Sequence, residues 1–196
     1  MLRKRLKALE DALLPDAQDP AGNYPPEQVE RTRAYLVLAH SEFESFLERS
    51  CRRTALTARA KVSAGKPSQV AIAVASYYDS GAVPPPSSWT DATNTQRSQI
   101  ALLERVVRCF DAYEETVTGN NGIKQSSLVK LLAPLGVDLG ALAEARLLEC
   151  DGFGEVRGNL AHGKAQQIID PFSEKATVDR LEVFFADLDK HLAGLS

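Results

Sequence analysis

The chain contains neither glycine nor proline between Glu27 and Ala64, and apolar residues recur there with helical spacing. Gly65 and Pro67 then end the run, because glycine favours helix C-termini and proline cannot continue a helix. At 1.5 Å per residue, an unbroken helix of this length would span roughly 57 Å, which is long for a compact domain. The pattern therefore predicts helix over most of this run, with a break or a projecting end near residues 52–57.

Helical periodicity extends over most of the remaining sequence. Leucines spaced four, three and four residues apart predict a first helix that ends near Pro15, and residues 16–26 form a Pro-, Asp- and Gly-rich connector. Asp151 is a candidate N-cap for a helix near the C-terminus, because its carboxylate can accept from the first backbone N–H groups. The other expected helices cover approximately residues 70–78, 103–117, 126–133, 138–150 and 178–195.

A loop interrupts this helical pattern in the middle of the chain. Three consecutive prolines exclude a helix from residues 79–95. No run of residues shows the alternation of a strand, and no internal repeat is present. We therefore expect an all-α fold in which residues 1–196 form one domain, with residues 1–26 as its N-terminal helix and connector.

The composition is that of a globular protein, with 44% hydrophobic and 25% charged residues. The formal net charge of −3 provides no chain-wide attraction for nucleic acids, so any RNA contact must come from a local cluster. The densest basic stretch is Arg49 to Lys66. Such a run is most often a solvated helix face, but it is also a candidate for contacts to the RNA backbone. No apolar segment has the length needed to cross a membrane.

The cysteines favour a reducing environment. They are three in number and widely spaced, at Cys51, Cys109 and Cys150, which argues against a disulfide framework or a zinc knuckle. The sequence has only three histidines and offers no set of zinc ligands, and it lacks a Gly-rich phosphate loop and a Gly-x-Ser-x-Gly elbow. These features favour a cytoplasmic location and leave few sites for chemistry.

One candidate site is the seven-residue segment from Arg157 to Gly163. Arginine carries a permanent forked cation that fits phosphate oxygens, and His162 can exchange a proton near neutral pH. On an ideal helix, positions five apart differ by about 140° in azimuth, so this pair suits a cleft approached from two sides, for example by two protomers. Asn159 lies three residues before His162 and can orient its imidazole or a ligand. The alternative is a capped, solvent-facing helix end.

Two polar residues border the apolar face of the helix expected at residues 29–50. His40 lies at one edge of this face and Glu42 at the other, where an ionised carboxylate needs a partner. Glu42 is therefore either a supporting residue of the site or a half-buried carboxylate bonded to an arginine or a helix end. We interpret His40 as an ordinary residue at the edge of the core.

Several blocks of this sequence resemble the HEPN superfamily, most closely its RiboL-PSP-associated subgroup. The two distinctive blocks are residues 34–48, which read Ala-Tyr-Leu-Val-Leu-Ala-His-Ser-Glu-Phe-Glu-Ser-Phe-Leu-Glu, and the Arg-x4-His segment at residues 157–163. Residues 120–124 and 131–137 also look like that subgroup, so the resemblance covers roughly residues 29–192.

The resemblance implies an up-and-down helical bundle with additional helices, which forms a homodimer and brings two Arg-x4-His motifs into one cleft. Many HEPN proteins are metal-independent endoribonucleases of toxin–antitoxin, phage-exclusion or other defence systems, so RNA and an antitoxin or defence protein are the expected partners. His162 would transfer a proton and Arg157 would bind the phosphate, while the 2′-hydroxyl of RNA attacks and a cyclic phosphate forms. DNA would be inert, and no metal or other cofactor is expected.

The sequence departs from the family within this motif. The position after the arginine is commonly Asn or Asp in HEPN proteins and is Gly158 here, while Gly152 and Gly154 make the preceding turn less regularly helical. Asn159 can supply a polar side chain from the next position, on a different face. HEPN domains without nuclease activity also exist, so the alternative function is a non-catalytic module that dimerises and binds RNA, a nucleotide or a partner protein.

Overall fold

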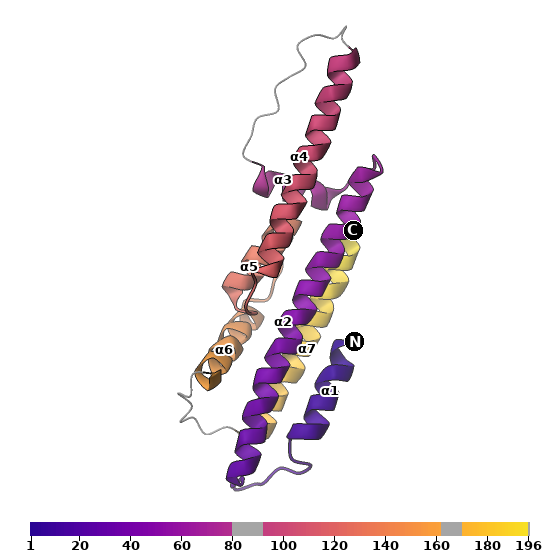
Figure 1. Cartoon of the computed structure of the whole chain (residues 1–196). Helices are drawn as coiled ribbons and strands as arrows, with labels where there is room; N and C mark the ends of the chain where they lie inside the picture. The colour runs from indigo at the N-terminus through magenta and orange to yellow at the C-terminus, as the bar shows by residue number, and fades with distance from the viewer. Residues whose placement is uncertain (80–91, 162–169, 196) are drawn as a thin grey trace. The chain divides into compact units, whose positions relative to one another are not determined.

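A computed structural model describes residues 1–79, 92–161 and 170–195 of the chain. The described residues are predominantly helical and contain no strand, which confirms the all-α prediction (Figure 1). None of the helices within these ranges combines the length and the apolar composition needed to span a bilayer.

Seven α-helices and two short 3-10 turns make up the described structure. They are α1 (Leu2–Leu13), α2 (Pro26–Ser63), α3 (Gln69–Tyr78), α4 (Ala92–Thr118), α5 (Gln125–Leu132), η1 (Ala133–Leu135), η2 (Leu139–Ala141), α6 (Glu144–Ala161) and α7 (Pro171–Leu195). The helices predicted at the start of the chain and around residues 70–78, 103–117, 126–133 and 178–195 are therefore confirmed.

The helices belong to two compact units, each assembled from stretches that are distant in the sequence. The first unit consists of Met1–Leu47, Asn121–Leu128 and Gly140–Lys190. The second unit consists of Glu48–Asn120, Val129–Leu139 and His191–Ser196. Helix α2 contributes its N-terminal part to the first unit and its C-terminal part to the second.

The first unit is built around the N-terminal part of α2. The apolar face of this part is buried, at Tyr35, Leu36, Ala39, Phe43 and Leu47. The rings of Phe43 and of Phe185 in α7 stack with their centroids 5.1 Å apart. Phe43 also meets the ring of Phe153 in α6 edge-on, with a centroid distance of 6.0 Å. One aromatic side chain of α2 therefore contacts both α6 and α7.

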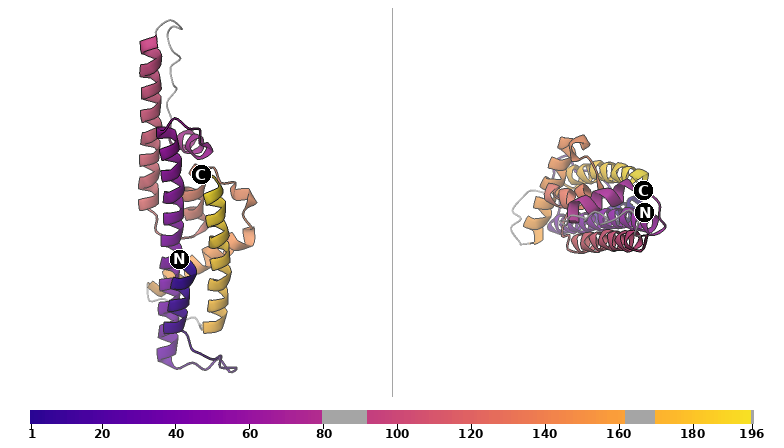
Figure 2. Two further views of the ribbon diagram at one scale, coloured as in Figure 1. Left: turned by 90° about the vertical axis from the view of Figure 1, so that its right-hand side faces the viewer. Right: turned by 90° about the horizontal axis from the view of Figure 1, so that it is seen from above.

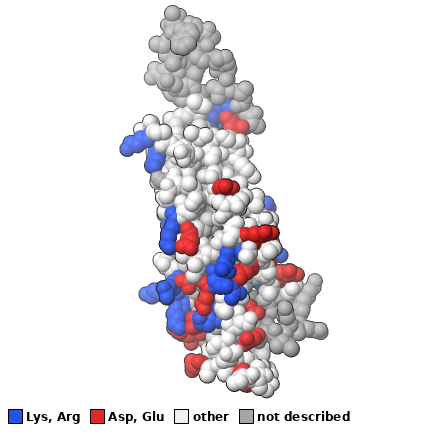
Figure 3. Space-filling view, turned by 180° about the vertical axis from the view of Figure 1, so that it is seen from behind, with Lys and Arg blue, Asp and Glu red and all other residues white. Residues whose placement is uncertain are grey.

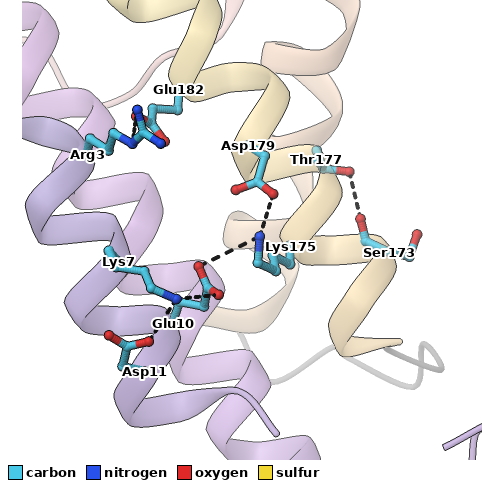
Figure 4. Close-up of polar contacts among 9 residues, drawn as sticks. All are labelled: Arg3, Lys7, Glu10, Asp11, Ser173, Lys175, Thr177, Asp179 and Glu182. Carbon is cyan, nitrogen blue, oxygen red and sulfur yellow. Dashed lines mark hydrogen bonds and ion pairs between the residues drawn. The ribbon is translucent and has the colours of Figure 1, made fainter. Parts of the chain in front are cut away.

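Helix α1 runs antiparallel to α7 in the same unit and lies beside the N-terminal part of α2 (Figures 1 and 2). Two of its leucines are buried. Ion pairs also connect it to α7 (Figure 4). The Nε of Arg3 lies 3.9 Å from Oε1 of Glu182. The Nζ of Lys175 lies 3.7 Å from Oε2 of Glu10. Because exposed pairs contribute only about 0–1 kcal/mol each, the buried leucines hold α1 in place and the ion pairs set its register.

In the second unit, the C-terminal part of α4 runs antiparallel to the C-terminal part of α2. Arg59 of α2 binds the Asp111 carboxylate at 2.8 Å. Two turns earlier in α2, Arg52 binds the Glu114 carboxylate at 2.6 Å. Two arginines of the basic stretch at residues 49–66 are therefore used to pack α4 against α2, which favours the structural interpretation for these two side chains.

Of the two alternatives predicted near residues 52–57, a break or a projecting end, the break is wrong, because α2 is continuous from Pro26 to Ser63. The hydroxyl of the buried Thr54 lies 3.1 Å from the Ser50 carbonyl oxygen and 3.3 Å from the Leu192 carbonyl oxygen. Its polar group is thus satisfied within the helix and against α7. A helix of this length is accommodated because its C-terminal part supports the second unit.

The predicted helix at residues 138–150, followed by a new helix capped by Asp151, is also wrong. Residues 139–141 form a 3-10 turn, and α6 is a single helix from Glu144 to Ala161. Asp151 lies inside α6, and its Oδ1 accepts from the backbone N–H of Gln125 at 2.7 Å. The carboxylate therefore caps the N-terminus of α5, a helix that is distant in the sequence.

The glycines of α6 do not interrupt the helix, contrary to the expectation of an irregular turn. An internal glycine costs about 1 kcal/mol relative to alanine. Gly152 and Gly154 lie on either side of Phe153, whose side chain is buried. Burial of this aromatic ring contributes about 1.5–3 kcal/mol and offsets much of the cost.

The structure describes only the two ends of the loop predicted at residues 79–95. Residues 80–91 lie outside the described residues, and α4 begins at Ala92. The last four residues of that loop prediction are therefore helical, since no proline occurs after Pro86 in this segment to prevent it.

Candidate functional site

Arg157, the predicted phosphate-binding residue, lies near the C-terminal end of α6 in the first unit. Its side chain is half-buried, and its Nε is shielded from solvent without a hydrogen-bond partner. Leaving a buried donor unsatisfied costs about 1–3 kcal/mol. An anion that accepted this hydrogen bond would remove that cost.

The other half-buried arginines of the described residues each form an ion pair. They are Arg33, Arg52, Arg59, Arg105 and Arg146, which pair with Glu30, Glu114, Asp111, Asp79 and Glu149 in that order. Arg157 forms no ion pair with any residue in the described ranges. Since arginines with a purely structural role in this protein have carboxylate partners, the exception at Arg157 favours a binding role.

A buried histidine lies beside Arg157. His40 of α2 is only 2% exposed, and its ring stacks on Phe153 with a centroid distance of 6.0 Å. Phe153 and Arg157 are four residues apart on α6 and share one face of that helix. Burial, and to a smaller extent the charges of Arg157 and Lys124, lower the pKa of His40 from 6.5 to about 4. The imidazole is therefore neutral at pH 7, and its place in the core agrees with the interpretation from the sequence.

Lys124 brings a second cation to this face of α6. Its exposed side chain comes from the residue before α5, and its aliphatic part crosses α6 at Gly154. A Cβ atom at residue 154 would lie 2.8 Å from Cγ of Lys124, closer than real Cβ contacts allow. Gly154 and Arg157 are three residues apart, so both lie on the same face of α6. Because residue 154 has no side chain, Lys124 can pack against the face of α6 that carries Arg157.

Of the other predicted site residues, Glu42 and Asn159 are not part of this cluster. Glu42 lies 2.9 Å from Nη2 of Arg5 in α1, which favours the structural interpretation of its half-buried carboxylate. Asn159 is exposed, two residues beyond Arg157 on a different face of α6. His162 lies outside the described residues. A Cβ atom at Gly158 would have no atom within 4 Å, so the missing polar side chain would extend into open space.

Sequence reasoning missed Lys124 and assigned no site role to His40. No local pattern points to Lys124, because α5 and α6 are brought together by tertiary contacts. The hydrogen bond from Gln125 to the Asp151 carboxylate ties the start of α5 to α6 and so places the preceding lysine over Gly154. The one available signal was Gly154 itself, a glycine inside a helix, which often marks a close approach.

The surroundings of the cluster favour an anionic ligand. On the face shown in Figure 3, basic and acidic side chains of the described residues are intermixed, without a broad patch of one sign. Within the described ranges, no group of three or more His, Cys, Asp and Glu side chains is placed to hold a metal ion. The local cations Arg157 and Lys124 would attract an anion to the cluster.

Comparisons with family models, with curated proteins and with solved structures gave no match to this chain. The resemblance to the HEPN superfamily therefore rests on the sequence blocks alone, and the functional argument rests on the cluster around Arg157.

The buried neutral His40 predicts a loss of stability in mild acid. Its ordinary pKa of 6.5 applies to the unfolded chain, and its pKa in the folded chain is about 4, so the unfolded state binds the proton first as the pH falls. Its contribution to the free energy of unfolding is complete above pH 6.5 and decreases as the pH falls to 4. The total loss is roughly 3 kcal/mol for a pKa shift of this size. Urea unfolding measured between pH 7.5 and pH 4.5 should show most of this loss.

The control for this prediction is His40→Phe, which keeps an aromatic ring against Phe153 and cannot bind a proton. Its free energy of unfolding should fall much less over the same pH range, because the carboxylates that titrate there are common to both proteins. An equal fall in both proteins would show that His40 is not the group that titrates.

Proposed function

We propose that this chain is a metal-independent endoribonuclease of the HEPN type, in which Arg157 binds the scissile phosphate and His162 transfers a proton. The observation that carries the proposal is the half-buried guanidinium of Arg157, which lacks an ion pair within the described residues. His162 belongs to the same seven-residue block of sequence. A forked cation for phosphate and a group that titrates near pH 7 are the two components that this reaction needs.

In the proposed reaction, the 2′-hydroxyl of the RNA attacks the adjacent phosphorus and the bond to the 5′-oxygen of the next nucleotide breaks. His162 takes part in the accompanying proton transfer. Arg157 stabilises the negative charge that develops on the phosphorane oxygens. The products are a 2′,3′-cyclic phosphate and a 5′-hydroxyl end, and DNA is inert because it lacks the nucleophile.

We further propose that the active form is a homodimer. Positions five apart on an ideal helix differ by about 140° in azimuth, so residues 157 and 162 of one helix would not face the same side. A cleft formed by two protomers would supply both groups to one phosphate. A toxin–antitoxin or phage-defence role in the cytoplasm, with an antitoxin or defence protein as partner, is the biological setting that we propose.

A non-catalytic HEPN module that binds RNA, a nucleotide or a partner protein is the second candidate. The observation that favours it is Gly158, which leaves open space where HEPN proteins commonly carry a polar side chain. Such a module would retain the anion site at Arg157 and would lack cleavage.

The test is to incubate the purified protein with a structured RNA in excess chelator and to analyse the ends of the products. The nuclease proposal predicts cleavage with 2′,3′-cyclic phosphate ends, no cleavage of the matched DNA, and loss of cleavage in His162→Ala. The control is His191→Ala, which removes an exposed histidine of α7 and should cleave as the wild type does. Absence of cleavage by a folded wild-type dimer would favour the binding module, and equal cleavage by His162→Ala would contradict the assigned role.

A further inference from the structure

We propose that Lys124 and Arg157 together form a two-cation site for a backbone phosphate of RNA, and that Gly154 is required because it admits Lys124. This inference deepens the proposed function and rests on it, since it names the group of the substrate that the cluster binds. Lys124 is a binding residue in this proposal and takes no part in proton transfer.

The side chain of Lys124 packs against α6 at Gly154. A Cβ atom at residue 154 would lie 2.8 Å from its Cγ, 3.1 Å from its Cε and 3.5 Å from its Cδ. The whole aliphatic part of the side chain therefore crosses the helix at this glycine. The carbonyl oxygen of Lys124 accepts from the N–H groups of Ser127 and Leu128, at 2.8 and 2.9 Å, so its backbone is held at the start of α5.

Both cations act on the same buried group, the imidazole of His40. Arg157 and Lys124 are the two charges that lower the pKa of His40, so both lie within electrostatic range of one imidazole. His40 is 2% exposed and its Nδ1 has no hydrogen-bond partner, with the Glu44 carboxylate 3.9 Å away. Because the imidazole is neutral, it adds no positive charge to the site.

The two cations are not neutralised by an ion pair in the described part of the chain. Within the described residues, neither Lys124 nor Arg157 forms an ion pair. Asp151 of α6 accepts from the N–H of Gln125 at 2.7 Å. Two cations held on one helix face without a carboxylate partner repel each other, and an anion between them relieves that repulsion.

The chemistry of the two side chains favours a phosphate. A guanidinium binds two oxygens of one phosphate through parallel hydrogen bonds, and an ammonium adds a point charge to it. The ammonium end of Lys124 belongs to an exposed side chain, so a bound phosphate would reach the site from solvent. The adjoining backbone of an RNA strand would then extend along the surface beyond the site.

The experiment measures binding of a fluorescent 2′-O-methyl RNA 12-mer, which cannot be cleaved, to the full chain by fluorescence anisotropy at several salt concentrations. Lys124→Gln should weaken binding about five- to tenfold and reduce the slope of log K against log salt by about one, as expected for one lost phosphate contact. The matched control is Lys130→Gln, which removes an exposed lysine of α5 and should leave both the affinity and the slope unchanged.

Gly154→Ala provides a second test that leaves every charge in place. Alanine is a better helix former than glycine, and the flexible lysine side chain can move away, so this variant should fold. It should weaken binding of the 12-mer as Lys124→Gln does, because Lys124 would be displaced from Arg157. Gly152→Ala is its control, since a Cβ atom at residue 152 meets no atom within 4 Å.

The outcomes separate this inference from the proposed function. If Lys124→Gln and Gly154→Ala bind the 12-mer as tightly as the wild type, or if the wild type does not bind it, the two-cation site is overturned, whatever the cleavage assay shows. If binding depends on Lys124 but the wild type does not cleave RNA, the site stands as a binding site and the nuclease proposal fails.

Discussion

Replacing Phe43 with alanine is expected to lower the free energy of unfolding by about 3–5 kcal/mol, the usual cost of removing a buried phenylalanine ring. Phe43 has no exposed surface, and its ring contacts Phe185 at 5.1 Å and Phe153 at 6.0 Å between centroids. The cavity would lie where α2, α6 and α7 meet in the first unit. Since Phe153 also supports His40, the same substitution should loosen the cluster around Arg157.

The measurement is urea unfolding followed by far-UV circular dichroism at pH 7.5. The matched control is Phe184→Ala, because Phe184 is the next residue to Phe185 on α7 and is only half-buried. Its loss should lower the free energy of unfolding by about 1–2 kcal/mol, in proportion to the smaller apolar area removed from the interior. Similar losses in the two variants would contradict the central position of Phe43 in this core.

The elements with an uninterrupted apolar stripe could be predicted from the sequence. Helices α1 and α7 carry leucines or mixed apolar residues at alternating three- and four-residue spacing. Helix α7 buries most of this stripe, and α1 buries Leu2 and Leu6. The break expected in α2 followed from the assumption that one compact domain must contain the helix. Local sequence does not reveal that the two ends of a helix support two separate units.

The error at Asp151 and the two alternatives left open for Glu42 have a common physical cause. Asp151 has the chemistry of an N-cap, but the sequence does not say which helix end its carboxylate reaches. The need of Glu42 for a partner was predictable from its place on the flank of an apolar stripe, whereas its pairing with Arg5 depends on how α1 packs. In both cases the residue type indicates the interaction, and the tertiary fold selects the partner.

The candidate site was likewise predictable from the sequence only in part. The chemistry of Arg157 could be predicted from the motif, because a guanidinium near a histidine suits phosphate chemistry in any fold. Three other features depend on elements that only the folded chain brings together. They are the lack of an ion pair at Arg157 within the described residues, the neutral imidazole of His40 and the neighbouring side chain of Lys124. A sequence pattern cannot show these three features.

The second large effect is expected at Arg157. Arg157→Gln should reduce kcat for RNA cleavage by about 10²–10³-fold, the usual cost of removing one donor that stabilises charge in a transition state. Arg157→Lys should recover only part of this loss, since it restores the charge but not the forked geometry. Single-turnover cleavage at saturating RNA measures the effect on chemistry, and Arg108→Gln, at an exposed arginine of α4, is the control that should cleave normally.

Stability distinguishes this role from a structural one. Removal of an arginine that holds the fold through an ion pair would lower the free energy of unfolding. The guanidinium of Arg157 instead leaves a buried Nε unsatisfied, so its replacement by glutamine should leave the free energy of unfolding unchanged or slightly raised. Loss of cleavage together with retained or increased stability is the combination expected of a residue kept for binding an anion. A variant that lost stability and cleavage together would place Arg157 among the structural arginines.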